Sequence, residues 1–577
     1  MHFVKKVPTS DEEKAVKEKE RAIKLKAFCT IRDKIFEKRG KGELDDEILS
    51  LTQKLLEKNP DIYTFWNIRR ETIEKKIQEW KNCELTTNDE SCKEGCKRKI
   101  ENLLEGELFL TQECLEENHK SYAAWFHRGW ALKRQENPDI KRDLALCEKA
   151  LKLDCRNFHT FDHRRLVAKL GSLGDAEELE FSNRLIAQNF SNYSAWHYRA
   201  VLLPRIQNAE TGTFTLSDGV IANELKKATS AFFTDPEDQS AWVYSRWLFE
   251  MGSNKEFLRS DSDSPAVPLS VSFHGNNTTV VMSKPCTLNE VLSLLVCSPE
   301  ASWRGVSSLS AQPLSARIWQ CISNSPCSLQ LDLEPIDISK KPYLAKALLR
   351  HAFGMGGRKM DVALKTITDN CKKLMEMEPK NMWARYMYTL CLIETRPDEC
   401  HEEILKNLDM LATELDVRRK EIYKKLASRQ ILNRILCEGT RHTPLLERLM
   451  DGDTDELSIR NEALSSLDGV ELLAGLVKHL DVSGNELSSL SEVLLPNLEY
   501  LTANENPIKE VSPTETLSNL KFLSLGACQL EQPSSVVPAL KAMPSLERFL
   551  YCETPLCQKT EEIARELPSV RLIPYYL

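Results

Sequence analysis

Residues 118–128 read Asn118-His119-Lys120-Ser121-Tyr122-Ala123-Ala124-Trp125-Phe126-His127-Arg128, and versions of this stretch recur along the first half of the chain. The shared pattern is Asn or Asp, three residues, an aromatic residue, two residues, Trp or Phe, two residues, and Arg. The other copies begin at Asn59, Asp154, Asn189 and, with the arginine displaced to Arg246, at Asp235; a looser copy lies around Trp383. The anchors at 66, 125, 161, 196 and 242 are separated by 59, 36, 35 and 46 residues, so the basic unit has about 35 residues.

Each copy follows a segment with the periodicity of an amphipathic helix, as in Leu144, Leu146, Ala150 and Leu151. The Asn, Asp and Pro residues that come next stop helices and form turns, and the Trp and Arg then open a second helix. Two helices joined by a tight turn cannot bury both apolar faces alone. We therefore expect a mainly α protein in which αα-hairpins stack into a solenoid over 1–250 and 340–440. The period also fits tetratricopeptide repeats, but these copies lack the small Gly and Ala positions of those repeats.

Residues 255–337 have a different character, since Ser, Pro, Val and Leu replace the Glu and Lys of the helical region. Apolar residues alternate with others from Val267 to Phe273, a turn follows at 274–277, and Thr279-Val280-Val281-Met282 comes next. Such alternation between turn residues is typical of strands in a small antiparallel sandwich. A disordered linker is the alternative, but it would not carry so many Val, Leu and Trp residues. We expect an inserted, Ig-like β-sandwich with its own core.

The last part of the chain, 443–577, repeats at a shorter period. One unit reads Leu480-x-Val482-x-x-Asn485-x-Leu487, and related units begin at Leu457, Leu501, Leu523 and Phe549. The offsets of 23, 21, 22 and 26 residues lie within the range of leucine-rich repeats. The Asn or Cys position of each unit turns the chain and bonds neighbouring backbones, so it is scaffold. We expect a leucine-rich-repeat domain that, like the insert, folds around a core of its own.

The composition narrows the function classes. A chain of 577 residues is too long for one core, and 41% apolar with 28% charged residues is ordinary for a globular protein. The net charge of −8, without a basic domain or stripe, argues against a nucleic-acid-binding protein. No uncharged run of 18 residues is present, so we expect no transmembrane segment. Eighteen cysteines without an apolar signal peptide are expected to be reduced thiols in a cytoplasmic protein.

The helical copies resemble the repeat of the protein prenyltransferase α subunits, whose signature is Asn/Asp-x-x-x-Tyr-x-x-Trp-x-x-Arg. Four good copies, one displaced copy and one degenerate copy carry this resemblance over about 1–250 and 340–440. With the β-insert and the leucine-rich tail, the chain is similar to the type II branch of this family, which geranylgeranylates Rab GTPases. The farnesyl and type I branches share the helical repeats but lack both added domains.

This resemblance implies partners and an activity. The chain would be the α subunit of a heterodimeric protein geranylgeranyltransferase, wrapped around a β subunit that carries the zinc and the prenyl pocket. The substrates would be geranylgeranyl diphosphate and the C-terminal cysteines of Rab GTPases presented by a Rab escort protein. No cofactor is expected on this chain alone. The alternative is a non-enzymatic scaffold that binds proteins through both solenoids, and equimolar co-elution of a zinc-containing subunit distinguishes the two.

The resemblance also implies two site residues facing the diphosphate. Lys120 lies two positions before a motif tyrosine, where the farnesyltransferase α subunit has a diphosphate-facing lysine. His159 follows Phe158 at the place of a Tyr-His pair, and Phe158 lacks the hydroxyl for the phenolic contact. The alternative roles are a surface lysine and a histidine packed in a turn. Separately, His2 lies near a terminus, and we predict that its neutral imidazole occupies the open position on the partner's zinc when no substrate thiol is bound.

Patterns for metal binding or for a nucleophile within this chain are weak. Cys92-x-x-x-Cys96, with Cys83 upstream, has the wrong spacing for a zinc knuckle and no following His pair. Asp398-x-Cys400-His401 follows Pro397 in an expected turn and should be solvated. The sequence contains no Gly-rich phosphate loop, nucleophile elbow or HExxH motif. We therefore expect the transfer chemistry to need a second chain.

Overall fold

The computed structural model describes residues 11–86, 88–207, 216–251, 265–274, 277–296, 300–306, 315–322, 328–331, 334–336, 338, 342–355, 362–438, 443–512 and 515–575. The chain divides into two compact units, Met1–Ile206 and Gln207–Leu577. Each unit is described by itself. Within the described ranges no helix is both long and apolar enough to cross a membrane.

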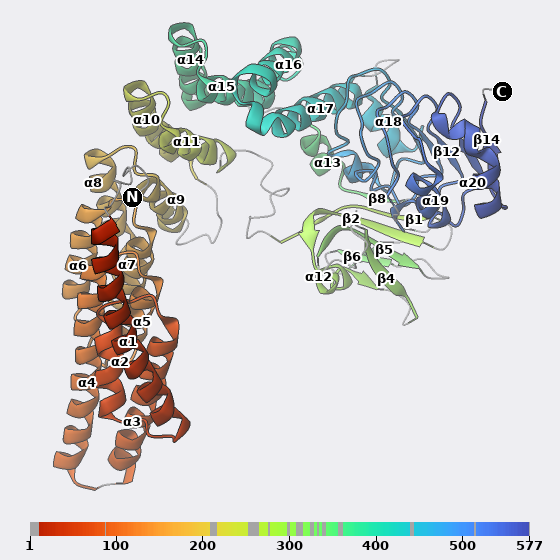
Figure 1. Ribbon diagram of the computed structural model, residues 1–577. Helices are drawn as coiled ribbons and strands as arrows, with labels where there is room; N and C mark the ends of the chain where they lie inside the picture. Colours follow the sequence, from red (N-terminus) through yellow and green to blue (C-terminus); the bar gives the residue numbers. More distant parts are fainter. Residues whose placement is uncertain are drawn as a thin grey trace. The chain divides into compact units, whose positions relative to one another are not determined.

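Unit 1 is a stack of antiparallel helices, red to tan in Figure 1. Its helices are α1 (Asp11–Gly40), α2 (Asp46–Leu56), α3 (Tyr63–Thr86), α4 (Glu90–Glu117), α5 (Tyr122–Leu132), α6 (Ile140–Leu153), α7 (Phe158–Leu170), α8 (Asp175–Gln188) and α9 (Tyr193–Gln207). The second helix of each hairpin (α3, α5, α7 and α9) begins at the first aromatic residue of a motif copy. The expected helical solenoid is therefore confirmed.

The motif residues fix the turn between the two helices of a hairpin. In the second copy, the Asn118 side chain accepts a hydrogen bond from the Lys120 amide at 3.1 Å, and the Ser121 hydroxyl caps α5 by accepting from the Ala124 amide at 3.3 Å. The Trp125 indole donates to the His119 carbonyl, six residues earlier, at 2.9 Å. The tryptophans of three other copies make the same bond, at 2.7–2.9 Å: Trp66, Trp196 and Trp242.

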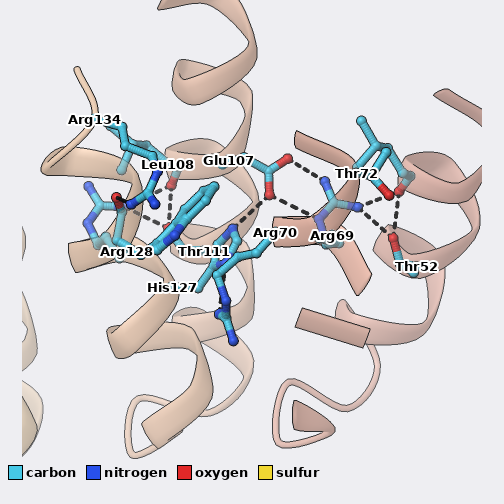
Figure 2. A network of polar contacts seen from close by, with 12 residues as sticks. Thr52, Arg69, Arg70, Thr72, Glu107, Leu108, Thr111, His127, Arg128 and Arg134 are labelled. Carbon is cyan, nitrogen blue, oxygen red and sulfur yellow. Dashed lines mark hydrogen bonds and ion pairs between the residues drawn. The ribbon is translucent and has the colours of Figure 1, made fainter. Parts of the chain in front are cut away.

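Three motif arginines form buried ion pairs, Arg69 with Glu107, Arg128 with Asp143 and Arg164 with Glu178, and Figure 2 shows the first. Arg69 on α3 donates from Nε to Glu107 Oε2 on α4 at 2.9 Å, and its Nη1 donates to the Thr52 hydroxyl at 2.9 Å. His127 Nε2 on α5 lies 2.9 Å from the same Glu107 oxygen. One carboxylate thus joins three helices, which explains why a charged motif residue belongs to the core.

This arrangement recurs with a constant spacing. The acid of each cluster precedes a His or Tyr by 20 residues: Glu107 and His127, Asp143 and His163, Glu178 and Tyr198, Glu224 and Tyr244. Each His or Tyr accompanies a motif copy, and each acid lies in the first helix of the same hairpin. The sequence reading missed these acids, although the constant spacing is a signal that would have found them.

The helices of unit 2 continue the same repeat. They are α10 (Asp218–Thr234), α11 (Gln239–Met251), α13 (Lys346–Ala352), α14 (Val362–Met377), α15 (Met382–Thr395), α16 (His401–Met410), α17 (Lys420–Cys437) and α18 (Leu445–Asp451). The α14–α15 hairpin packs on the α10–α11 hairpin across the intervening insert. Asn381 caps α15 by accepting from the Ala384 amide at 2.9 Å and donates to the Pro236 carbonyl at 3.0 Å. The loosest motif copy therefore makes a true hairpin.

The insert between α11 and α13 contains two antiparallel sheets. The larger has the order β4-β5-β2-β1-β8 and the smaller β3-β6-β7. The strands are β1 (Pro268–His274), β2 (Asn277–Cys286), β3 (Leu295–Val296), β4 (Ser302–Val306), β5 (Ala316–Ile322), β6 (Ser328–Leu331), β7 (Glu334–Ile336) and β8 (Tyr343–Leu344), with the short helix α12 (Leu288–Leu292). The expected period-two strands are present, and Val271, Val280 and Trp319 lie in a core of the insert's own.

The tail is a coil with a parallel sheet of six short strands in the order β14-β13-β12-β11-β10-β9 (Figure 1). They are β9 (Glu456–Ser458), β10 (His479–Asp481), β11 (Tyr500–Thr502), β12 (Phe522–Ser524), β13 (Arg548–Leu550) and β14 (Arg571–Ile573), with short helices that include α19 (Val537–Lys541) and α20 (Thr560–Glu566) between some of them. The middle residue of each of the first five strands opens one of the sequence units. Buried Asn485 donates to the carbonyls of Ile459 and Val482, at 2.7 and 2.8 Å.

The insert has a core of its own, as expected, but the expectation that it and the tail pack independently is wrong. Leu269, Val281 and Ile318, on one face of the larger sheet, belong to the same hydrophobic core as the leucines of the tail. The polar contacts agree, since Thr279 donates to Asn497 at 3.1 Å and Arg317 to Glu471 at 2.9 Å. The period-two pattern marks both faces of the insert as buried but cannot tell which element covers them.

Candidate functional site

A groove lies between α5 and α7 in unit 1 and has a volume of about 420 Å³. Its walls are Tyr122, Trp125, Phe126, Gly129, Trp130, Lys133, Arg134, His159, Asp162, His163 and Leu166. Two motif copies supply it, because stacked hairpins place equivalent turns next to each other. The Asn157 side chain donates to the His119 carbonyl at 2.8 Å and so ties these two turns together.

Lys120 lies on the turn that enters α5, two residues before the first lining residue, Tyr122, but does not itself line the groove, and its side chain is 60% exposed. Its ammonium is 2.8 Å from Asp154 Oδ2, on the equivalent turn of the next hairpin. The hydrogen bond from Lys120 lowers the pKa of the Asp154 carboxyl. The lysine is thus an exposed cation with a carboxylate partner, and the sequence does not predict this pairing.

His159 is buried in the groove wall, in the first turn of α7. Its ring lies between the aromatic rings of Tyr122 and Phe158, with centroids 3.9 and 4.0 Å apart. Burial lowers the pKa of the imidazole, Asp162 opposes that shift, and the nearby charge of Lys120 adds to it. The imidazole is therefore neutral near pH 7 and close to a cation.

Tyr122 is a site residue that sequence reasoning missed. The sequence marks Tyr122 only as a repeat-motif position, yet the residue is 58% exposed and its ring packs on His159. Phe158 lacks a hydroxyl, but Tyr122 places a phenol beside the same histidine. The signal was present in the spacing, because Tyr122 and Phe158 occupy the same position of consecutive copies.

The far end of the groove carries a second cationic group. The Arg134 guanidinium lies over the Trp130 ring at 4.1 Å and makes an ion pair with Glu74 at 2.6 Å. A guanidinium that lies over an aromatic ring suits a ligand in which an anionic group is joined to an apolar group. The groove residues contain no Ser–His or Cys–His nucleophile pair.

Metal ligands are not gathered in this groove. His159, Asp162 and His163 line the groove but do not form a close group of metal-ligating atoms. Within the described ranges such a group is formed by Cys83, Cys92 and Cys96, on α3 and α4. Asp398, Cys400 and His401 do not form such a group there. His2 lies outside the described residues.

Unit 2 has a smaller groove of about 230 Å³ between α11, α15 and α17. Two of its arginines lie over aromatic rings, Arg246 over Tyr386 at 5.7 Å and Arg419 over Trp383 at 5.3 Å. The displaced arginine of the fifth motif copy therefore does not take the buried position of the earlier motif arginines but lines an aromatic surface.

The comparisons with known proteins agree with this architecture. The profile of the protein prenyltransferase alpha subunit repeat matches residues 104–135, 140–170, 175–206 and 221–252. Three geranylgeranyl transferase type-2 subunit alpha proteins are similar over 99% of this chain: those of Sus scrofa (33% identity, 100% of that protein), Bos taurus (32%, 100%) and Homo sapiens (32%, 99%).

The repeats and the helical stack together define a protein prenyltransferase α subunit. Full-length similarity narrows the class further, because it includes the insert and the tail as well as the helices. The chain belongs to the family of geranylgeranyl transferase type-2 α subunits.

Proposed function

We propose that this chain works in the cytoplasm as the α subunit of a heterodimer that transfers geranylgeranyl groups from geranylgeranyl diphosphate to the C-terminal cysteines of Rab GTPases. The observation that carries the proposal is the 33% identity to a type-2 α subunit over 99% of this chain and all of that protein. The groove adds a chemical reason, since Lys120 and His159 beside it suit an anionic leaving group.

The zinc and the prenyl pocket are assigned to the β subunit. Zinc bound there would supply a stabilised substrate thiolate. His2 is proposed to reach that zinc from the terminus, and a deletion of the first few residues should then raise basal activity, whereas unchanged kinetics would count against this role.

Lys120 is proposed to act on the leaving group. As the bond between the prenyl carbon and oxygen breaks, negative charge grows on the diphosphate, and a fixed ammonium stabilises that transition state more than the ground state. Asp154 holds the ammonium at the turn, 2.8 Å away, so little ordering is needed when the diphosphate arrives. Tyr122 adds a hydroxyl donor next to the neutral imidazole of His159.

We infer that the tail is a leucine-rich-repeat domain and the insert an Ig-like sandwich. The one-strand-per-unit parallel sheet and the buried Asn485, which bonds to neighbouring units, support the first, and the two antiparallel sheets support the second. Because these two domains share a core, they are proposed to act as one body. A Rab GTPase presented by a Rab escort protein is the proposed cargo of the complete enzyme.

Co-expression tests the proposal. With the β subunit, the chain should form a stable equimolar complex that prenylates Rab in the presence of the escort protein and geranylgeranyl diphosphate. Alone, the chain should aggregate, because a subunit that wraps a partner exposes apolar surface. A well-behaved monomer with full transfer activity, or an inactive complex, would contradict the proposal.

A further inference from the structure

Three cysteines meet on the α3–α4 hairpin of unit 1. Cys83 lies in the last turn of α3, and Cys92 and Cys96 lie in the first two turns of α4. Their sulfur atoms are all within 4.8 Å of one another. α3 and α4, which belong to consecutive motif hairpins, are the longest of the helices α2 to α9, with 24 and 28 residues, and the end of α3 and the start of α4 lie at one end of the stack (Figure 1).

The spacing explains the cluster. Cys92 and Cys96 are four residues apart on a helix, so their side chains project from the same face. Two histidines at this spacing on a helix are an established zinc-binding pair, and two cysteines can chelate in the same way. The antiparallel α3 contributes the third sulfur. The spacing of these cysteines does not match a zinc knuckle, because a loop sets the spacing in a knuckle, whereas a helix sets it here.

The cluster has charged neighbours and one open side. Cys92 is the third residue of α4, which Asp89 caps. Lys93 and Lys97 follow the two helix cysteines directly and pair with Glu90 at 2.6 Å and Glu84 at 3.8 Å. Burial decreases from Cys96 through Cys92 to the exposed Cys83, so one side of the cluster is open to solvent.

We propose that Cys83, Cys92 and Cys96 form a zinc site that clasps the end of the α3–α4 hairpin. Zinc binds thiolate sulfur at about 2.3 Å, so the sulfurs of a tetrahedral site are about 3.8 Å apart. The three sulfurs lie within 4.8 Å of one another, so each needs to move by only about 1 Å to reach that spacing. Each thiol releases its proton to solvent on binding, and a water molecule fills the fourth position on the open side.

A disulfide is the competing chemistry for these sulfurs. A bond between Cys92 and Cys96 is geometrically poor, because both lie on one helix and the S–S bond needs side chains that converge to about 2 Å. A bond from Cys83 to either of them would leave the third thiol alone. Zinc binding uses all three sulfurs together, and the mutual proximity of the three sulfurs therefore favours zinc over a disulfide.

Metal content tests the proposal on the full-length chain in complex with its β subunit. Zinc should be counted by mass spectrometry of the metal in wild type, Cys83→Ser, the triple Cys→Ser variant and the control Cys29→Ser, whose thiol on α1 lies outside the cluster. Zinc held by the β subunit contributes equally to wild type and variants, so the difference in zinc content between them reports on this chain alone. We expect both cluster variants to contain one zinc fewer per heterodimer, and Cys29→Ser to match wild type.

A second readout identifies the ligands. After removal of zinc with a chelator, added Co²⁺ should give a thiolate charge-transfer band in wild type and in Cys29→Ser, and part of this band should be lost in Cys83→Ser, which removes only an exposed side chain. Equal zinc content in wild type and the cluster variants would overturn the proposal. It would also be overturned by a disulfide from Cys83 to either helix cysteine in complex purified without reductant or chelator.

Discussion

Arg128 and Asp143 meet inside the helical stack through two parallel hydrogen bonds, 2.6 Å from Nε to Oδ1 and 3.0 Å from Nη2 to Oδ2. Both side chains are fully buried, and His163 Nε2 lies 2.8 Å from the same Oδ1. Burial alone would raise the pKa of the Asp143 carboxyl, but His163 and Arg128 together lower it to about 2. The aspartate is thus the charged centre that holds α5, α6 and α7 together.

Asp143→Asn should destabilise this part of the stack. The substitution keeps the shape but leaves Arg128 as an uncompensated buried charge, which costs roughly 3–5 kcal/mol. We expect hydrogen exchange of the backbone amides of α5, α6 and α7 to accelerate in the complete heterodimer. The control is Glu105→Gln on α4. This substitution removes the exposed ion-pair partner of Arg142, which lies on α6 like Asp143, and should lower the free energy of unfolding by at most about 1 kcal/mol. Equal effects of the two substitutions would show that the buried pair has no special role.

Stability should fall as the pH is lowered below about 6.5, the ordinary pKa of histidine. Burial lowers the pKa of His127 and of His163, although each donates a hydrogen bond to a carboxylate, which opposes the shift. Between the lowered folded pKa and the ordinary unfolded one, the unfolded chain binds more protons, so lower pH favours unfolding. The depressed pKa of Glu107, about 2, extends the loss of stability to still lower pH.

Thermal unfolding of the heterodimer between pH 5 and pH 8 tests whether stability falls as the pH is lowered. We expect the midpoint to rise with pH and to level off above about pH 7. His163→Gln removes one of the titrating histidines and should make the curve flatter between pH 5 and 6.5. A midpoint that rises on acidification would contradict the assignment of neutral, buried imidazoles.

The start of each second helix was predictable from sequence, because the turn, the indole bond and the helix cap all lie within one motif copy. The partners of the motif arginines were not predictable in the same way. Arg69 and Glu107 are 38 residues apart, whereas Arg128 and Asp143 are 15 apart, since the length of the intervening helices varies. Contacts within a repeat have a fixed spacing, but contacts between repeats depend on every insertion.

The candidate site shows the same limit. Lys120 was found through its position relative to a motif tyrosine, but its pairing with Asp154 joins two turns of neighbouring hairpins and leaves no local pattern. The shared core of the insert and the tail was missed for a related reason. Alternation along β2 predicts that Val280 and Val281 point to opposite faces, but not that the tail covers the face of Val281.

Removal of the tail should therefore damage the insert. Deletion of 443–577 exposes Leu269, Val281 and Ile318, so we expect a chain that aggregates or in which the insert is cleaved rapidly by protease. The control deletion removes the insert and the tail together, so that of the shared core only the residues of α13 and α17 are uncovered, and should aggregate less than the deletion of the tail alone. The two deletions are compared by yield and by limited proteolysis of the complexes. A stable insert after removal of the tail alone would contradict the shared core.

Lys120→Ala should lower kcat for prenyl transfer by roughly ten- to a thousand-fold, or about 1.4–4 kcal/mol of transition-state stabilisation. The reason is that the ammonium faces the charge that develops on the diphosphate, so the loss should appear in kcat more than in the affinity for geranylgeranyl diphosphate. Lys120→Arg should rescue only part of the rate, because a planar guanidinium does not match a site for a compact charge. Single-turnover kinetics of the intact heterodimer separate the chemical step from product release.

Lys149→Ala is the matched control for this prediction. Its ammonium is as exposed as that of Lys120, 62% against 60%, and it makes an equivalent ion pair with Glu116 at 2.9 Å, but it lies on α6, which contributes no residue to the groove. The two substitutions remove the same charge from the same unit, so a general electrostatic effect would slow both variants equally. We expect Lys149→Ala to turn over like wild type. If Lys120→Ala does so too, Lys120 is a solvated turn lysine paired with Asp154, and the β subunit alone stabilises the leaving group.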